Sequence, residues 1–337
     1  MSFNQNSGYG RALLDAVQKA IPSFGRIFIV ANSSDYADYK YSYLQDIFKT
    51  DPEGQVRFFT DLATAYAATQ SNNNDVIVLD NHTSHKVTSM LTVSNSRVHF
   101  MGFDGGGRKI GARTLISNTG TGAATDVAMV YVTGTGCSFR NISFKNNWTV
   151  AQNLYSVKDW GIQTYFENCD VENLGSAHLT NASAASLNLG GNECIYKNCT
   201  IGQDTLLVTS TAGQQILISN RGSSSTKSTR SRFEDCRIQS YTSDTTHVFV
   251  RAGANAIDRS VTFDDCEFDN NLTATSAATL AVAAATDASV AGELHFSYPK
   301  IYGASNLATA AVGNTSVYVV SAVLGAAASD CVAVQAS

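Results

Sequence analysis

The sequence predicts an all-β fold: a right-handed parallel β-helix with a small N-terminal α/β cap and a β-rich C-terminal tail. Three observations predict it. A six-residue phrase recurs five times, its residues alternate between apolar and polar, and the alternation slips once, always at the same place. Such a repeat indicates stacked coils, each too small to bury its own inner face.

The repeated phrase reads aromatic, polar, Asn or Asp, Ile or Cys, polar, apolar. Its aromatic positions are separated by 27, 30, 37 and 30 residues, a spacing typical of a stacked-repeat architecture. Read as strands, the phrase turns its aromatic residue inward, and we expect these residues to form the core. The core aromatics are Phe139, Phe166, Tyr196, Phe233 and Phe263.

The Asn or Asp of each phrase marks a corner of the coil. These residues tolerate the left-handed backbone region better than other non-glycine residues, and their side chains can bond to nearby backbone. Stacked corners predict a side-chain ladder, with a column of small thiols packed just inside it. The ladder residues are Asn141, Asn168, Asn198, Asp235 and Asp265, and the thiols are Cys169, Cys199, Cys236 and Cys266.

Through this motif the chain resembles the pectate-lyase-like β-helix superfamily over roughly residues 75–300. The resemblance implies the fold and leaves the function open, because the superfamily contains lyases, hydrolases, esterases, phage tailspikes and non-catalytic virion proteins.

The segments around the repeats divide the chain into four parts, and their hydrophobic periods predict the elements of each. The parts are an arm and helix at 1–24, a capping region at 25–96, the β-helix at 97–270 and a terminal coil with tail at 271–337. The expected elements are helices over 10–21 and 60–69, strands at 25–30 and 75–80, a first full coil starting at 97–102, and tail strands at 317–320 and 331–334.

Composition narrows the function classes. Charged residues make up 15% of the chain and the net charge is −5 without a basic run, so we expect no direct nucleic-acid partner. No apolar run reaches about 18 residues, which argues against a membrane-spanning helix. The first ten residues lack the apolar region of a secretory signal, and most of the seven cysteines occupy inward repeat positions, so we expect cytoplasmic synthesis without a disulfide framework.

One string looks enzymatic. Residues 203–206 read Gln-Asp-Thr-Leu and resemble a box of the pectin methylesterases, in which the resemblance implies that Gln203 helps to hold an oxyanion. That family also needs a nucleophilic Asp downstream. This chain has no carboxylate between Asp204 and Glu234, which argues against an esterase.

The remaining candidates for chemistry are carboxylate clusters, histidines and tryptophans. Glycosidases need two flanking acids, and a Ca²⁺-dependent lyase needs acidic oxygens beside a basic residue, but on outward strand positions such charges are typical of a solvated face. The candidates are Asp264, Glu267 and Asp269; Glu167, Asp170 and Glu172; Arg237 and Arg251; His82 and His85 for a metal; and Trp148 and Trp160 for sugar stacking or core packing. None completes a site, so the sequence assigns no catalytic residue, metal ligand or cofactor.

The overall layout resembles structural proteins of tailed phages: a polar arm, a helix, two apolar strands, a few coils and a tail of small residues. The resemblance implies a non-enzymatic virion component, a capsid-surface or decoration subunit that assembles with copies of itself and with the major capsid protein. The alternative is a polysaccharide-binding or polysaccharide-degrading β-helix protein, such as a tailspike-like lyase or hydrolase.

Overall fold

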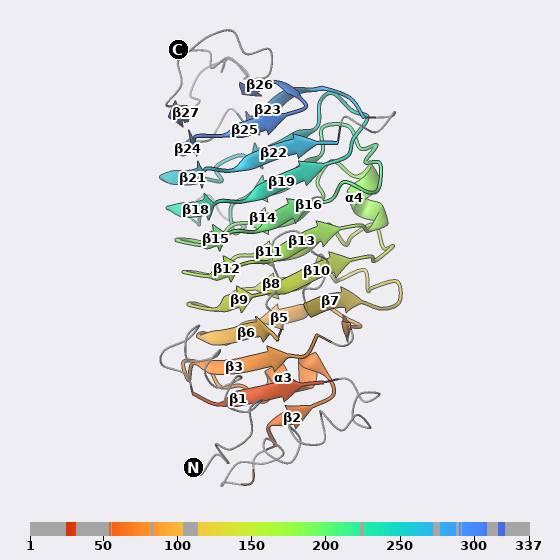
Figure 1. Ribbon diagram of the computed structural model, residues 1–337, viewed down its shortest axis with the longest axis vertical. Coiled ribbons are helices and arrows are strands. Elements are labelled where there is room, and N and C mark those ends of the chain that lie inside the picture. The colour runs from red at the N-terminus through yellow and green to blue at the C-terminus, as the bar shows by residue number, and fades with distance from the viewer. Residues whose placement is uncertain are drawn as a thin grey trace.

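The computed structural model describes residues 25–31, 54, 56–81, 84–103, 114–222, 226–271, 277–287, 290, 292–308 and 316–320. The predicted helix over 10–21, the strand at 331–334 and His82 lie outside these residues. The described residues form an elongated stack of coils, with β1 (Ile27–Val30) and β2 (Phe58–Phe59) near one end of the stack and β26 (Ala304–Ala308) and β27 (Ser316–Val320) at the other (Figure 1).

Each coil contributes one strand to each of three parallel sheets, and neighbouring strands in a sheet come from successive coils. The first sheet runs β2 (Phe58–Phe59), β1 (Ile27–Val30), β3 (Asp75–Leu79), β6 (Val98–Gly102), β9 (Ser138–Arg140), β12 (Tyr165–Glu167), β15 (Ile195–Lys197), β18 (Ser231–Glu234), β21 (Ser260–Asp264), β24 (Glu293–Ser297), β27 (Ser316–Val320). The second sheet runs β4 (His85–Val87), β7 (Thr114–Asn118), β10 (Ile142–Asn146), β13 (Asp170–Asn173), β16 (Thr200–Gly202), β19 (Arg237–Ser240), β22 (Glu267–Asn270), β25 (Lys300–Tyr302). The third sheet runs β5 (Leu91–Val93), β8 (Ala128–Val132), β11 (Tyr155–Asp159), β14 (Ala185–Leu189), β17 (Gln214–Ile218), β20 (Val248–Ala252), β23 (Leu280–Thr286), β26 (Ala304–Ala308). The fold is therefore an all-β parallel β-helix, as predicted.

The first and second sheets meet at a corner of one or two residues, which lies where the sequence places it. Asn141, Asn168 and Asn198 have φ of 58°, 53° and 51°, and Asp235 and Asp265 have φ of 51° and 50°. The amide Nδ2 of Asn168 donates to Oδ1 of Asn141 at 3.2 Å, and Nδ2 of Asn198 donates to Oδ1 of Asn168. Backbone N–H groups continue the column, from Asn198 to Glu234 O and from Asp235 to Asp264 O.

The core aromatic rings form one continuous stack. Neighbouring ring centroids lie 4.5–5.0 Å apart from Phe100 through the five predicted residues to Phe296, with interplanar angles of 7–17°. This spacing follows the strand separation of a parallel sheet, because each ring comes from the same position of its coil. The stack is therefore one coil longer at each end than the repeated phrase indicates.

The thiol column links coils as well as filling the core. The Sγ of Cys169 donates to Phe139 O at 3.4 Å, and Cys199, Cys236 and Cys266 make the same contact with the aromatic residue of the preceding coil at 3.6, 3.3 and 3.6 Å. All four are 0% exposed. Burial raises the pKa of Cys236 well above its ordinary value, so this group is a neutral thiol.

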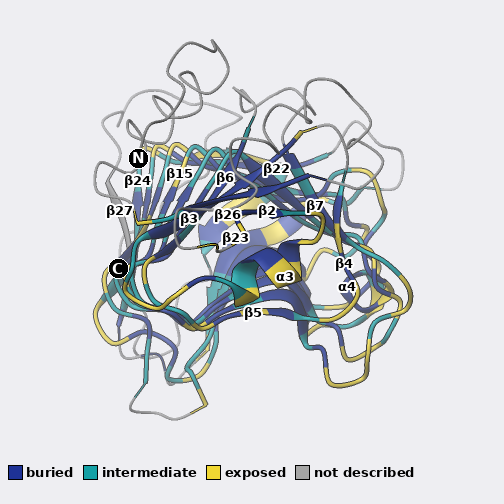
Figure 2. Ribbon diagram, turned by 90° about the horizontal axis from the view of Figure 1, so that it is seen from below, coloured by how far each residue is buried: buried dark blue, intermediate teal, exposed yellow. Residues whose placement is uncertain are grey.

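Helix α3 (Leu62–Ala67) covers the N-terminal open end of the coil (Figure 2). The Asp61 carboxylate accepts from the N–H of Thr64 and begins the helix, and Leu62 and Ala65 are buried. The Tyr66 ring lies 6.1 Å from that of Phe100 and so closes the aromatic stack. A capping helix of this kind protects the last apolar face of a solenoid from water.

The solenoid begins one coil earlier than the sequence indicates. The prediction places the first full coil at 97–102, whereas β3, β4 and β5 already contribute to all three sheets. Strands β4 and β5 have three residues each and contain no copy of the phrase, so they carry too little pattern to be recognised. At the other end, β24, β25 and β26 form a complete last coil.

Candidate functional site

Five of the acidic residues considered for catalysis are paired with basic residues of neighbouring strands. Arg237 binds Glu267 at 3.2 Å and Asp269 at 2.5 Å, and Arg232 binds Asp264 at 2.7 Å. On an adjacent set of coils, Arg140 binds Glu167 and Lys145 binds Glu172, both at 3.3 Å.

These pairs join strands that neighbour each other within a sheet, such as β19 and β22 or β10 and β13. They lie on the outside of the coils, where single ion pairs contribute little stability. A glycosidase requires one free carboxylic acid and one free carboxylate on either side of a substrate bond. The paired arrangement of these five carboxylates does not provide that.

Gln203, the residue that resembles part of an esterase box, holds its own turn. Its Oε1 accepts the N–H groups of Thr205 at 2.9 Å and Leu206 at 2.7 Å, and its Nε2 donates to Leu206 O at 2.7 Å. The side chain is 1% exposed. Because the oxygen and the nitrogen of the amide both bond to this turn and the side chain is buried, Gln203 has a structural role here.

Gln203 belongs to a second polar column that the sequence analysis missed. Asn146 of β10 is the register partner of Asn173 of β13. Gln203 comes directly after Gly202, the last residue of β16 that has a register partner on β19. Nδ2 of Asn146 donates to Oδ1 of Asn173 at 3.1 Å. The side-chain oxygens of all three accept the N–H two residues ahead, at Trp148, Gly175 and Thr205. The column therefore starts each wide loop that leads from the second sheet to the third.

Of the two histidines considered for a metal site, the structure describes one, His85. His85 is buried at the start of β4, and its Nε2 lies 2.8 Å from Asp80 O. Within the described ranges, no group of three or more His, Cys, Asp or Glu side chains is arranged to hold an ion.

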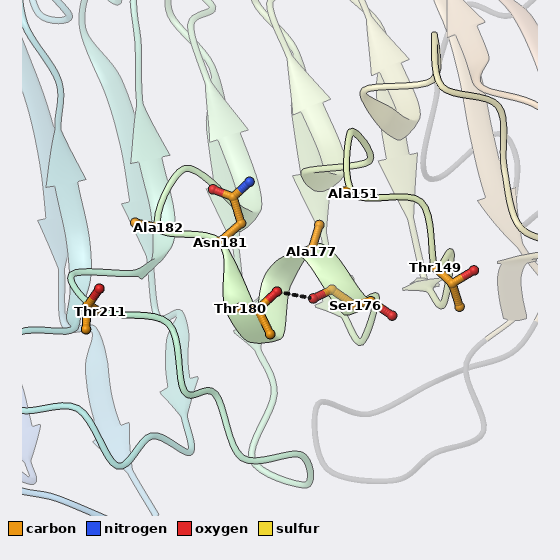
Figure 3. Close-up of a pocket in the computed structure, with 8 residues that line it drawn as sticks. All are labelled: Thr149, Ala151, Ser176, Ala177, Thr180, Asn181, Ala182 and Thr211. Atoms are coloured by element: carbon orange, nitrogen blue, oxygen red, sulfur yellow. Dashed lines mark hydrogen bonds between the residues drawn. The ribbon is translucent and has the colours of Figure 1, made fainter.

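A groove of about 460 Å³ lies over the wide loops, beside helix α4 (Ser176–Thr180) (Figure 3). Hydroxyl groups, one amide and alanine methyl groups line it, and Oγ1 of Thr180 donates to Ser176 O at 3.0 Å. The lining residues are Thr149, Ala151, Ser176, Ala177, Thr180, Asn181, Ala182 and Thr211. None of them titrates near neutral pH, so the groove suits a neutral polar ligand and lacks an acid or base.

On the outer face of the third sheet, aromatic side chains and a lysine form a cluster. Tyr131, Lys158 and Asn188 occupy the same register position on β8, β11 and β14. The Lys158 ammonium lies 3.7 Å from the centroid of Trp160 and 4.7 Å from that of Tyr131. The indole N–H of Trp160 donates to Asn188 Oδ1 at 2.8 Å. We call these four residues the Trp160 cluster.

The Trp160 cluster is partly buried and already well packed. A Cβ on Gly190 would lie 2.6 Å from the indole, so the absence of a side chain there lets Trp160 lie against the sheet. Burial lowers the pKa of Lys158 and raises that of Tyr131. A sugar ring could stack on Trp160 only after Lys158 moves aside.

Trp148, the other tryptophan, is a packing residue. It is 0% exposed, and its N–H donates to Thr119 O at 3.1 Å. The common register of Tyr131, Lys158 and Asn188 was visible in the sequence only as a spacing of 27 and 30 residues, without a shared residue type. A repeat search by residue identity therefore could not find the cluster.

No family model matches this chain, and no curated protein matches it. Among solved structures, pectate lyase Pel9A aligns with a TM-score of 0.51 at 12% identity, over 82% of this chain and 63% of the lyase. A deglycosylated pectin methylesterase from Aspergillus niger gives 0.49 at 14% identity, over 81% and 84%. The ORF18 protein of Geobacillus virus E2 gives 0.49 at 13% identity, over 88% and 72%. The chain thus has the right-handed parallel β-helix fold of pectate lyase Pel9A.

Proposed function

We propose that this chain is a non-enzymatic structural subunit of a tailed-phage particle, carried on the capsid surface as a decoration protein. The observation that carries the non-enzymatic part is the pairing of the candidate catalytic groups. Five carboxylates form ion pairs with basic residues, and the Gln203 amide bonds to its own turn. No helix within the described ranges is long and apolar enough to cross a membrane.

The particle role rests on the sequence layout and on the physical character of the chain. The charged fraction is 15%, low against about 25% in ordinary soluble domains. Coils joined by aromatic, amide and thiol columns make a stiff rod, which suits a subunit fixed to a shell. Its partners on this proposal are copies of itself and the major capsid protein.

The test is composition analysis of density-gradient-purified particles from cells that carry the gene, by quantitative mass spectrometry. The proposal expects this chain to sediment with the particles in a fixed ratio to the major capsid protein. A variant lacking residues 1–24 should fold but remain in the unassembled fraction. Absence of the full-length chain from washed particles would contradict the proposal.

A second function, carbohydrate binding, is favoured by the Trp160 cluster alone. Its indole, ammonium and amide groups combine the apolar and polar contacts that sugar rings use. A glycan array should show binding that Trp160→Ala abolishes. The matched control is Tyr302→Ala, which removes an aromatic side chain that is 51% exposed on the second sheet. Equal binding by both variants would exclude the cluster as the glycan site.

A further inference from the structure

Two histidines are buried inside the wide loops between the second and third sheets. His178, in helix α4, is 1% exposed, and His247, just before β20, is 0% exposed. Neither ring nitrogen of His178 has a hydrogen-bond partner among the described residues, and the same is true of Nδ1 of His247. Buried polar atoms without partners are rare in proteins and costly.

The two histidines belong to one polar cluster that spans three successive coils. A Cβ on Gly213 would lie 2.6 Å from Ser210 Oγ and 2.9 Å from His247 Nδ1, so both atoms face the same small space. Ser210 is 3% exposed, and its Oγ also lacks a partner. Its backbone N–H donates to Leu179 O at 3.0 Å, which places Ser210 against the residue after His178.

The charged groups around the cluster do not neutralise it. Burial lowers the pKa of His178 to about 4. Burial is the main cause that lowers the pKa of His247 to about 3, and the nearby His178 is the second. Asp244 raises the pKa of His247, and Arg251 lowers it. Asp244 accepts from the N–H groups of Ala212 and Thr246, and Arg251 donates to Gln214 Oε1 at 3.0 Å and to Ala212 O at 3.0 Å.

The segment over His178 is a loop with one short helix, held by neighbouring loops through Leu179 O, which accepts from the N–H of Ser210, and Ala184 O, which accepts from Nε2 of Gln214. Helix α4 has five residues and no side-chain cap at its N-terminus. The exposed groove of Figure 3 runs along its outer side, lined by Ser176, Ala177, Thr180 and Asn181. Opening this segment would bring His178 to water without separating the strands of any sheet.

We propose that this loop stack is an acid-sensitive switch: protonation of His178 and His247 opens the α4 segment, residues 174–184, and removes the wall of the adjacent groove while the coils stay folded. The direction follows from linkage. A histidine with a lowered folded-state pKa stabilises the closed form above pH 6.5, its ordinary value, and loses that contribution as pH falls toward the folded-state value. Each histidine should favour opening by about tenfold per pH unit in this window.

The test is hydrogen exchange with mass spectrometry at pH 7.0 and pH 5.0, corrected for the intrinsic exchange rate. Peptides covering 174–184 should lose protection several-hundredfold at pH 5.0, on the order of what two such protons give. Peptides covering 231–240, at the tight corner, should keep their protection. Equal protection of 174–184 at both pH values, or simultaneous opening of both regions, would overturn the proposal.

Substitutions of the two histidines test whether they cause the acid-induced opening. The double variant His178→Gln/His247→Gln should remove the pH dependence of exchange. The single variant His178→Gln should reduce that dependence to about tenfold per pH unit, and it tests the proposal if the double variant does not fold. His295→Gln is the matched control, since His295 is partly exposed beside Glu293 on the first sheet. His99→Gln controls for a half-buried histidine, whose pKa is lowered to about 4 by burial and then by Arg140. Acid opening that persists in the double variant, or that either control abolishes, would contradict the assignment.

Discussion

The two kinds of turn in this coil differ in what they demand of the sequence. The corner between the first and second sheets is a left-handed residue such as Asn168, alone or with one neighbour, and few residue types adopt that conformation. Between β7 and β20, the wide loops that join the second sheet to the third have seven or more residues each, for example 174–184. They need only a polar residue at their start. The comparison shows that a turn can be recognised in a sequence when its backbone conformation restricts the residue types that can occupy it.

The largest expected effect tests the aromatic stack beside the tight corner. Phe166→Ala should lower the free energy of unfolding by about 3–5 kcal/mol, because it removes a fully buried ring between two stacked neighbours. Denaturant unfolding followed by circular dichroism measures it. Tyr298→Ala, at a side chain that is 50% exposed, should change stability by less than about 0.5 kcal/mol. Equal effects of the two substitutions would remove Phe166 from the core.

A second experiment separates backbone conformation from amide bonding at the corner. Asn168→Ala should cost about 2–3 kcal/mol, since it loses two ladder hydrogen bonds and places alanine in a left-handed conformation. Asn168→Gly loses the same bonds without the conformational strain, so it should cost less by about 1 kcal/mol. If glycine costs as much as alanine, the backbone does not set the residue type, and the comparison between the two turns fails.

A third prediction concerns Asp159, which lies at the end of β11 and is 0% exposed. Its carboxylate accepts from Tyr196 at 2.6 Å and Thr164 at 2.5 Å. Burial raises its pKa above the ordinary 3.8, although these bonds lower it. The folded state therefore favours the protonated acid, and its contribution to stability falls as pH rises above about 3.8. The stability of Asp159→Asn relative to the natural chain should increase from pH 4 to pH 7; a constant difference in urea unfolding would contradict the raised pKa.

The smallest effect belongs to the outer ion pairs. Arg237→Ala removes contacts to Glu267 and Asp269 between partly exposed side chains, and we expect a loss of under about 1 kcal/mol, reduced further in high salt. Thermal unfolding at two salt concentrations measures it. A loss comparable to that of Phe166→Ala would mean that the charges, rather than the core columns, hold the coils together.

What could be predicted from the sequence depended on a repeated residue type as well as on backbone conformation. The fold, the core aromatics and the positions of the corner residues were accessible because an Asn or Asp next to an inward Ile or Cys recurs at five successive corners between the first and second sheets. The corner between the third and first sheets is left-handed too, but it uses Arg97, Gln163, Glu193 and Arg230, with φ of 53–57°. These residue types share no property that a sequence search would select.

The candidate site was less accessible for a related reason. The Trp160 cluster arises from residues that share a place in successive coils without sharing a chemical type. The two buried histidines lie at different places in loops that are two coils apart. Their proximity depends on loop lengths, which vary from coil to coil. For Gln203 the sequence indicated a function where the structure shows a structural role. Its four-residue motif resembles an esterase box, whereas its side chain holds a turn in the second polar column.

The thiol column has a practical consequence. Each of the six cysteines in the described part of the chain is a buried thiol that forms no disulfide, so an alkylating reagent can react only with molecules in which the surrounding coil has opened. The rate of modification at Cys169, Cys199, Cys236 and Cys266, resolved by peptide mapping, would therefore record the order in which successive coils come apart along the rod.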